Sequence, residues 1–145
     1  MSFAARHAAD LAAPPEVVWP LLVDFPSWPR WWADCRLASR RDRRPLAEGS
    51  RVELIVRLGR RERSLDAVVD LLNEGRGLTL VARGSFLRLT VSWELRALAG
   101  ASTRLRLHAA FAGIASGRLG AGRELLEASL RRHLRGLSQA AERLA

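Results

Sequence analysis

The strongest constraint on this chain is a series of five segments between residues 51 and 111 in which apolar side chains occupy every second position. Such alternation is typical of β-strands with one face in the core and the other in water. Turn-forming residues separate the segments, and short connections favour antiparallel neighbours. The sequence therefore predicts an antiparallel sheet whose strands cover residues 51–58, 64–71, 78–83, 87–96 and 104–111.

Two further strands and three helices are predicted around these segments. Looser alternation indicates strands over residues 2–12 and 35–41. Pro15 suits the first position of a short helix that reaches about Asp24, and Pro20 is expected to kink this helix or end it early. A tryptophan-rich second short helix or tight turn is predicted over residues 25–32.

A long amphipathic helix is predicted from residue 116 to residue 144, because leucines repeat there at multiples of three and four. Small residues flank this leucine stripe, and they would either allow a close approach or leave open volume. The stripe consists of Leu119, Leu126, Leu130, Leu137 and Leu144, and the small residues are Gly122, Ser129, Gly136 and Ala140.

These elements predict an α+β fold in one domain over residues 1–145. A curved seven-stranded antiparallel sheet around the long helix would let the apolar sheet face and the leucine stripe cover each other. A chain of 145 residues is long enough to bury a substantial core.

Charge gives the chain a basic character without indicating nucleic acid as the partner. All 24 basic side chains are arginine, which we attribute to codon bias, and 15 acidic residues leave a net charge of +9. Such a charge attracts polyanions and anionic membranes, and salt weakens the attraction. Most arginines of the strands alternate with apolar residues and so face water. Because no aromatic residues are interleaved with them, a stacking platform for nucleic acid is unsupported; peripheral contact with an anionic membrane stays open.

Several classes of protein are excluded by simple counts. Cys35 is the only cysteine, which excludes an internal disulfide and a cysteine-rich metal site. No apolar run reaches the roughly 18 residues of a membrane span. Arg6 and Asp10 interrupt the stretch that a signal peptide would need. We therefore expect a soluble, cytoplasmic protein without a metal or other cofactor.

The segment from residue 11 to residue 32 carries a family resemblance. It contains Ala13-Pro14-Pro15-Glu16-Val17-Val18-Trp19, then Leu22, Asp24 and Phe25, then Trp28-Pro29-Arg30-Trp31-Trp32. Together with the order of elements, this resembles the START-like (SRPBCC) superfamily, and within it the polyketide cyclase/dehydrase and lipid-transport group. The resemblance implies a helix-grip fold with a cavity between sheet and helix. Many relatives hold hydrophobic small molecules there, and a minority catalyse cyclisation, dehydration or hydrolysis.

Apolar residues of the inner sheet face and of the helix stripe are the candidates for lining this cavity, because ligand pockets are mostly apolar with few polar groups. The alternative is that the same side chains pack as core. The candidates are Trp32, Leu54, Val69, Leu80, Leu89, Trp93, Leu107 and Phe111 before the long helix, and Leu126, Leu130, His133 and Leu137 within it.

His7 and His133 are the polar candidates. Either could bind a ligand or act as acid or base near neutral pH; the alternative is a satisfied buried or rim histidine. Two histidines without a placed carboxylate make a weak metal site. The glycine-rich residues 117–122 lack the Gly-Lys-Ser/Thr ending of a phosphate loop.

Three functions follow as hypotheses. The first is a non-catalytic binding or carrier protein for a hydrophobic small molecule that is lipid-, polyketide- or isoprenoid-like. The second is a cyclase/dehydrase-type enzyme that acts on a polyketide-like or aromatic substrate with His133 or His7 as general acid or base. The third is an interaction module whose basic face docks an acidic protein or a membrane.

Overall fold

The structure, a computed structural model, describes residues 2–85, 87–113 and 122–145. Its first half contains β1 (Ser2–Leu11), α1 (Pro15–Val23), the 3-10 turn η1 (Phe25–Ser27), α2 (Trp28–Trp31), β2 (Cys35–Arg40) and β3 (Arg51–Leu58). The second half contains β4 (Arg61–Asn73), β5 (Gly77–Gly84), β6 (Leu87–Leu98), β7 (Ser102–Gly113) and α3 (Gly122–Leu144). The predicted order of elements is therefore confirmed. The first predicted residues of the long helix, Leu119 among them, lie outside the described residues.

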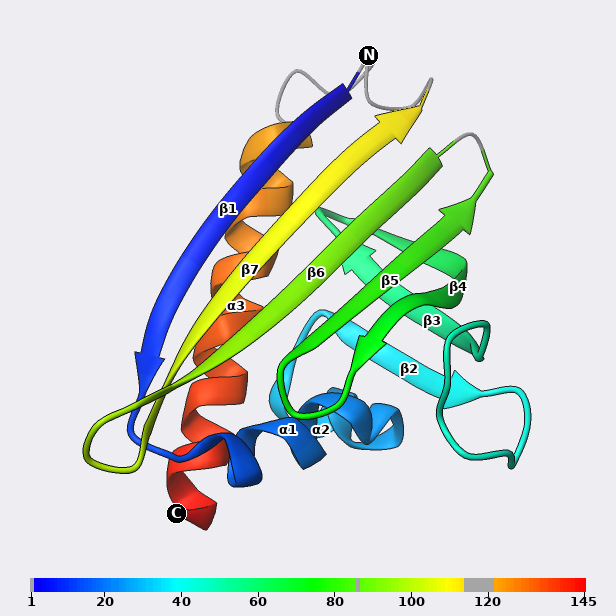
Figure 1. Cartoon of the computed structure of the whole chain (residues 1–145). Coiled ribbons are helices and arrows are strands. Elements are labelled where there is room, and N and C mark those ends of the chain that lie inside the picture. The colour runs from blue at the N-terminus through cyan, green and yellow to red at the C-terminus, as the bar shows by residue number, and fades with distance from the viewer. Residues whose placement is uncertain (1, 86, 114–121) are drawn as a thin grey trace.

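The described strands form one seven-stranded sheet in the order β1-β7-β6-β5-β4-β3-β2, and every neighbouring pair is antiparallel. The sheet is strongly curved, and α3 lies along its inner face behind β1, β7 and β6 (Figure 1). The short helices α1 and α2 lie at the end where α3 terminates. This is the predicted curved sheet around a long C-terminal helix. Among the described residues, no helix combines the length and the apolar character needed to cross a membrane.

Helix α1 passes through Pro20, so the expected early end does not occur. The helix continues to Val23, and the backbone N–H of Asp24 donates to the Pro20 carbonyl at 3.0 Å. Because Pro20 is exposed, its ring projects into solvent rather than into the core.

Strand β4 contains an irregularity that corrects one predicted face. The register with β5 shifts between Val69 and Leu71, so an extra residue interrupts the alternation there. Leu71, expected on the inner face with Leu65, Ala67 and Val69, is 50% exposed.

The core lies between the inner sheet face and the leucine stripe of α3. Leu126, Leu130 and Leu137 are buried. Leu144 at the helix end is 65% exposed, so, contrary to the prediction, it does not contribute to the core. Within the small flank of the stripe, Gly136 permits a close approach, but to α2 rather than to the sheet. A Cβ atom at Gly136 would lie 1.7 Å from the carbonyl oxygen of Trp31.

Candidate functional site

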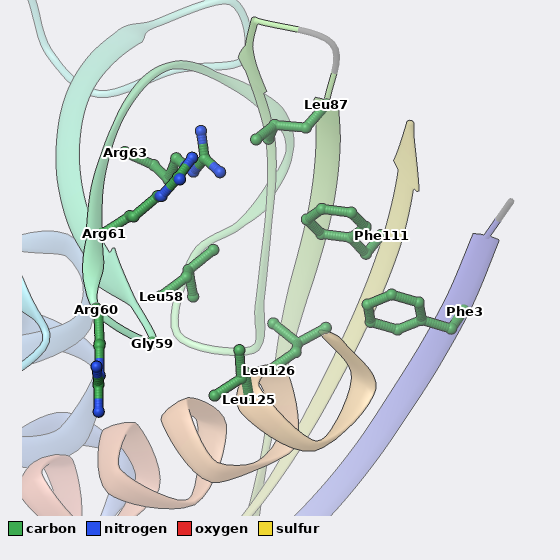
Figure 2. Close-up of a pocket in the computed structure, with 10 residues that line it drawn as sticks. All are labelled: Phe3, Leu58, Gly59, Arg60, Arg61, Arg63, Leu87, Phe111, Leu125 and Leu126. Atoms are coloured by element: carbon green, nitrogen blue, oxygen red, sulfur yellow. The ribbon is translucent and has the colours of Figure 1, made fainter. Parts of the chain in front are cut away.

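A pocket of about 230 Å³ lies between the inner sheet face and the first turns of α3. In Figure 2, Phe3, Phe111 and Leu87 approach it from the strands, and Leu125 and Leu126 approach it from the helix. The rings of Phe3 and Phe111 stack with centroids 5.0 Å apart, joining β1 to β7 along one wall. We call this space the outer pocket; its remaining lining residues are Leu58, Gly59, Arg60, Arg61 and Arg63.

The hairpin between β3 and β4 forms the opposite wall of the outer pocket. Leu58 pairs with Arg61, which leaves the two-residue turn Gly59–Arg60. Gly59 has φ +68°, a conformation that glycine adopts without steric cost and that two-residue hairpins require. The turn touches α3, because a Cβ atom at Gly59 would lie 3.2 Å from Leu125 Cδ1.

A second, smaller space of about 40 Å³ lies between sheet and helix. Leu58 and Leu126 border both spaces, so this inner chamber adjoins the outer pocket. About 40 Å³ has room for roughly one water molecule. Most side chains predicted to line a cavity are therefore packed against one another, and the larger open volume lies at the outer pocket.

The predicted lining residues fall into three groups. Eight of them border the inner chamber, two border the outer pocket with Leu126 common to both, and four border neither space. The first group is Trp32, Leu54, Leu80, Leu89, Trp93, Leu126, Leu130 and His133; the second is Phe111 and Leu126; the third is His7, Val69, Leu107 and Leu137.

The third group divides again by burial. Val69, Leu107 and Leu137 are buried in the core. His7 is half-buried on β1, and its Nε2 atom has no hydrogen-bond partner in the part of the chain that the structure describes.

His133 borders the inner chamber within a cluster of tryptophans. Its ring centroid lies 4.7 Å from that of Trp32, 5.0 Å from Trp31, and 5.6 Å from both Trp28 and Trp93. The indole Nε1–H of Trp93 donates to His133 Nε2 at 2.9 Å. This bond requires Nε2 to be unprotonated, so the imidazole is neutral.

Burial explains why His133 stays neutral. The residue is 1% exposed, and desolvation lowers the pKa of the imidazole to about 3. At neutral pH the ring has no acidic proton of an imidazolium to donate, and the lone pair on Nε2 is already engaged by Trp93.

Asp34 anchors the tryptophan-bearing segment to α3. Its carboxylate accepts hydrogen bonds from Ser129 Oγ at 2.8 Å and from Arg132 Nε at 2.9 Å. Its backbone carbonyl accepts from the N–H of Arg57 at 2.7 Å. A buried carboxylate held by two donors, together with a backbone carbonyl held by a third, fixes the junction of α2 and β2 against the helix.

Trp28 anchors the segment of short helices. It is buried, and its Nε1–H donates to the Leu22 carbonyl at 3.0 Å. In contrast, Trp32 Nε1 is buried without a hydrogen-bond partner among the described residues.

Arg61 and Arg63 are pocket residues that the sequence analysis missed, because the predicted strand began at Ser64. The structure begins β4 at Arg61 and keeps the alternation that places Leu65, Ala67 and Val69 inward. Extending that odd-numbered face by two positions would have found both arginines.

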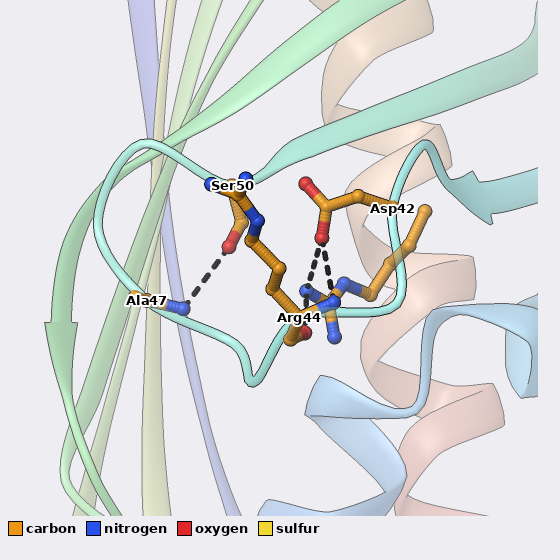
Figure 3. A network of polar contacts seen from close by, with 5 residues as sticks. Asp42, Arg44, Ala47 and Ser50 are labelled. Atoms are coloured by element: carbon orange, nitrogen blue, oxygen red, sulfur yellow. Dashed lines mark hydrogen bonds and ion pairs between the residues drawn. The ribbon is translucent and has the colours of Figure 1, made fainter.

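The arginines of the outer face are engaged in part by carboxylates. In the loop after β2, Asp42 Oδ1 accepts the backbone N–H of Arg44 at 2.9 Å, and Ala47 N–H donates to Ser50 Oγ at 3.0 Å (Figure 3). Arg41 forms an ion pair with Asp66. These contacts give the basic loop a defined conformation.

Other chemistries have little support in the described residues. Burial raises the pKa of the Cys35 thiol to about 12, so this cysteine is protonated at neutral pH and is a poor nucleophile. Within residues 2–85, 87–113 and 122–145, no three histidine, cysteine or carboxylate side chains gather closely enough to hold a metal ion.

Comparison with known families decides the classification. A family model described as polyketide cyclase / dehydrase and lipid transport matches residues 2–142. The chain belongs to this family. Its curved sheet around a C-terminal helix is the helix-grip architecture of the START-like (SRPBCC) proteins.

Solved structures share the fold of this polyketide cyclase/dehydrase and lipid transport family member. The Zhui aromatase/cyclase from Streptomyces sp. R1128 superimposes with a TM-score of 0.78 at 20% identity, covering 100% of this chain and 97% of that one. A START superfamily protein from Mycobacterium smegmatis gives a TM-score of 0.75 at 16% identity, with 97% and 95% covered. Comparison with curated proteins finds no match.

Proposed function

We propose that the chain is a binding or carrier protein for a hydrophobic small molecule, lipid-, polyketide- or isoprenoid-like, that occupies the outer pocket. The observation that carries this proposal is the apolar wall formed by Phe3, Leu58, Leu87, Phe111 and Leu126 between the sheet and α3. Burying an apolar ligand surface there contributes roughly 25 cal/mol per Å² before the costs of association. The family description, which names lipid transport, agrees with such a role.

The size of the pocket limits the ligand. A volume of about 230 Å³ lies below the roughly 300–1,000 Å³ of typical ligand sites. It has room for about eight water-sized groups. A short or medium apolar chain, or one or two rings, fits this space with its far end toward Leu58 and Leu126.

A cyclase/dehydrase-type enzyme is the second candidate, and the similarity to an aromatase/cyclase fold favours it. The arrangement of His133 gives this candidate weaker support. A general acid or base needs a pKa near the working pH and a free position toward the substrate. The pKa of His133 is about 3, and its Nε2 accepts the bond from Trp93.

The experiment is a titration with 1-naphthylamine, a neutral two-ring probe whose emission shifts to the blue in apolar surroundings. We expect saturable binding to the wild-type chain. Leu58→Trp places a larger side chain into the outer pocket and should weaken probe binding about tenfold, which corresponds to about 1.4 kcal/mol.

Leu37→Trp is the matched control, because Leu37 on β2 is 37% exposed and borders neither space. Absence of probe binding to the wild-type chain, or equal binding by Leu58→Trp and the control, contradicts the proposal.

A further inference from the structure

Two arginines interrupt the apolar inner face of the sheet at the outer pocket. On β4, the inward positions carry Leu65, Ala67 and Val69 and then, toward the pocket, Arg63 and Arg61. The other strands that line the pocket present Phe3, Leu58, Leu87 and Phe111. The change from apolar to cationic therefore belongs to one strand and coincides with the pocket.

Neither guanidinium group is neutralised by the part of the chain that the structure describes. No ion pair joins Arg61 or Arg63 to a carboxylate there, and the residues that line the pocket include no aspartate or glutamate. Glu62, between them, points to the other face and pairs with Arg36 at 2.8 Å. In Figure 2 the side chains of Arg61 and Arg63 extend from β4 over the pocket, whereas Arg60 extends away from it.

The two guanidinium groups carry like charges that a bound anion would offset. Two like charges on one strand face repel each other, and Arg63 is also half-buried. An arginine can cover apolar surface with its long stem while its charged end reaches water. This effect explains a single arginine at the edge of an apolar pocket. Two unneutralised arginines of one strand face beside an apolar pocket supply two planar guanidinium groups, and such groups suit a carboxylate or a similar oxyanion.

We propose that Arg61 and Arg63 bind the anionic head group of an amphiphilic ligand whose apolar body occupies the outer pocket. The inference rests on the proposed function and narrows its ligand class from hydrophobic molecules to apolar acids. The body should be short, since the pocket has a volume of about 230 Å³. A medium-chain carboxylic acid, ionised at pH 7, has both properties.

The test compares decanoate with decanol, which share one chain length and differ in the head group. Each is tested for displacement of 1-naphthylamine from the wild-type chain and from Arg63→Gln. We expect Arg63→Gln to weaken decanoate binding about fivefold to tenfold, because a hydrogen bond between two charged groups is lost and partial exposure limits its strength. The affinity for decanol should change less than twofold.

Arg88→Gln is the matched control, since it removes the same charge from an exposed position on β6 that does not border the outer pocket. Arg61→Gln, also exposed, is a second test variant, and circular dichroism establishes that each variant folds. An equal loss of affinity for decanoate in Arg63→Gln and Arg88→Gln would assign the effect to net charge and overturn the inference.

The remaining outcomes separate the two proposals. If the probe and decanol bind but neither Arg61→Gln nor Arg63→Gln changes the affinity for decanoate, the proposed head-group site is wrong. The proposal of a carrier for hydrophobic molecules is then retained. If neither the probe nor decanol binds to the wild-type chain, the carrier proposal fails and the head-group site fails with it.

Discussion

Among single residues, His133 has the most constrained surroundings. Its ring is 1% exposed, accepts a hydrogen bond from Trp93 and contacts three further tryptophans. The stripe of α3 was enough to predict that this histidine faces the sheet. The sequence did not reveal that its Nε2 is already bonded, because Trp93 is forty positions away and only the curvature of the sheet brings the two rings together.

The lowered pKa of His133 predicts a loss of stability in mild acid. The folded-state pKa is about 3, whereas the unfolded chain has the ordinary value near 6.5. Below pH 6.5 the unfolded state therefore binds a proton that the folded state excludes, and the stabilisation is lost progressively as pH falls toward 3. Urea unfolding should show a decrease of about 2 kcal/mol between pH 7 and pH 5 from this group.

His133→Gln isolates the contribution, because the glutamine side chain can accept the Trp93 N–H and does not titrate. The free energy of unfolding should depend less on pH in this variant than in the wild type, with carboxylate effects common to both. If the free energy of unfolding depends on pH in the same way in both proteins, burial does not lower the pKa of His133.

Among the elements, the crossing of α3 over α2 depends on one missing side chain. A Cβ at Gly136 would lie 1.7 Å from the Trp31 carbonyl oxygen, so the two helices have to separate to admit any other residue.

Gly136→Ala should destabilise the protein by about 2–3 kcal/mol in urea unfolding, although alanine favours helix by about 1 kcal/mol over glycine. Gly77→Ala is the control, because its new Cβ would lie at an ordinary 3.6 Å from the Trp93 carbonyl oxygen. A neutral or stabilising Gly136→Ala would mean that the helices move apart at little cost.

Strand β4 illustrates which parts of an element the sequence can predict. Alternation located its middle correctly, because Leu65, Ala67 and Val69 all face inward. Its ends were wrong for two reasons. The irregularity after Val69 turns Leu71 outward, and the inward Arg61 and Arg63 break the apolar pattern that marks a strand. A residue placed for binding rather than for packing is invisible to a search for hydrophobic periodicity.

For the molecule as a whole, the layers were predictable and the open space was not. Apolar residues at every second position indicate the strands, and apolar residues three to four positions apart indicate the helix. These spacings account for the sheet, its curvature around α3 and the buried leucine stripe. The size of the predicted internal cavity depends on how the side chains fill the space between sheet and helix, and the spacing of apolar residues does not give this. Trp28 and Trp32 line the small inner chamber, and the larger of the two spaces lies near Phe3, which was not a predicted lining residue, and Phe111, which was.

The net charge of +9 predicts a stability that rises with modest salt. Self-repulsion of an unbalanced charge disfavours the compact state, and raising NaCl from 10 to 200 mM shortens the screening length from about 30 Å to below 10 Å. The urea midpoint should increase over this range. The increase should be smaller in Arg88→Glu, which reduces the charge and places an acid opposite Arg83. A falling midpoint would mean that attraction within pairs such as Arg104–Asp10 outweighs the repulsion.

The pairing of β1 with β7 has a consequence for how the chain folds. Ser2 lies opposite Ala112, so the first strand synthesised takes its place beside the last. The strands β2 to β7 join neighbours along the chain and can form by successive hairpins, whereas β1 has to wait for the most distant partner. Contacts of such long sequence separation slow folding. On the ribosome, Phe3 and its strand therefore remain unpaired until nearly the whole sheet has emerged.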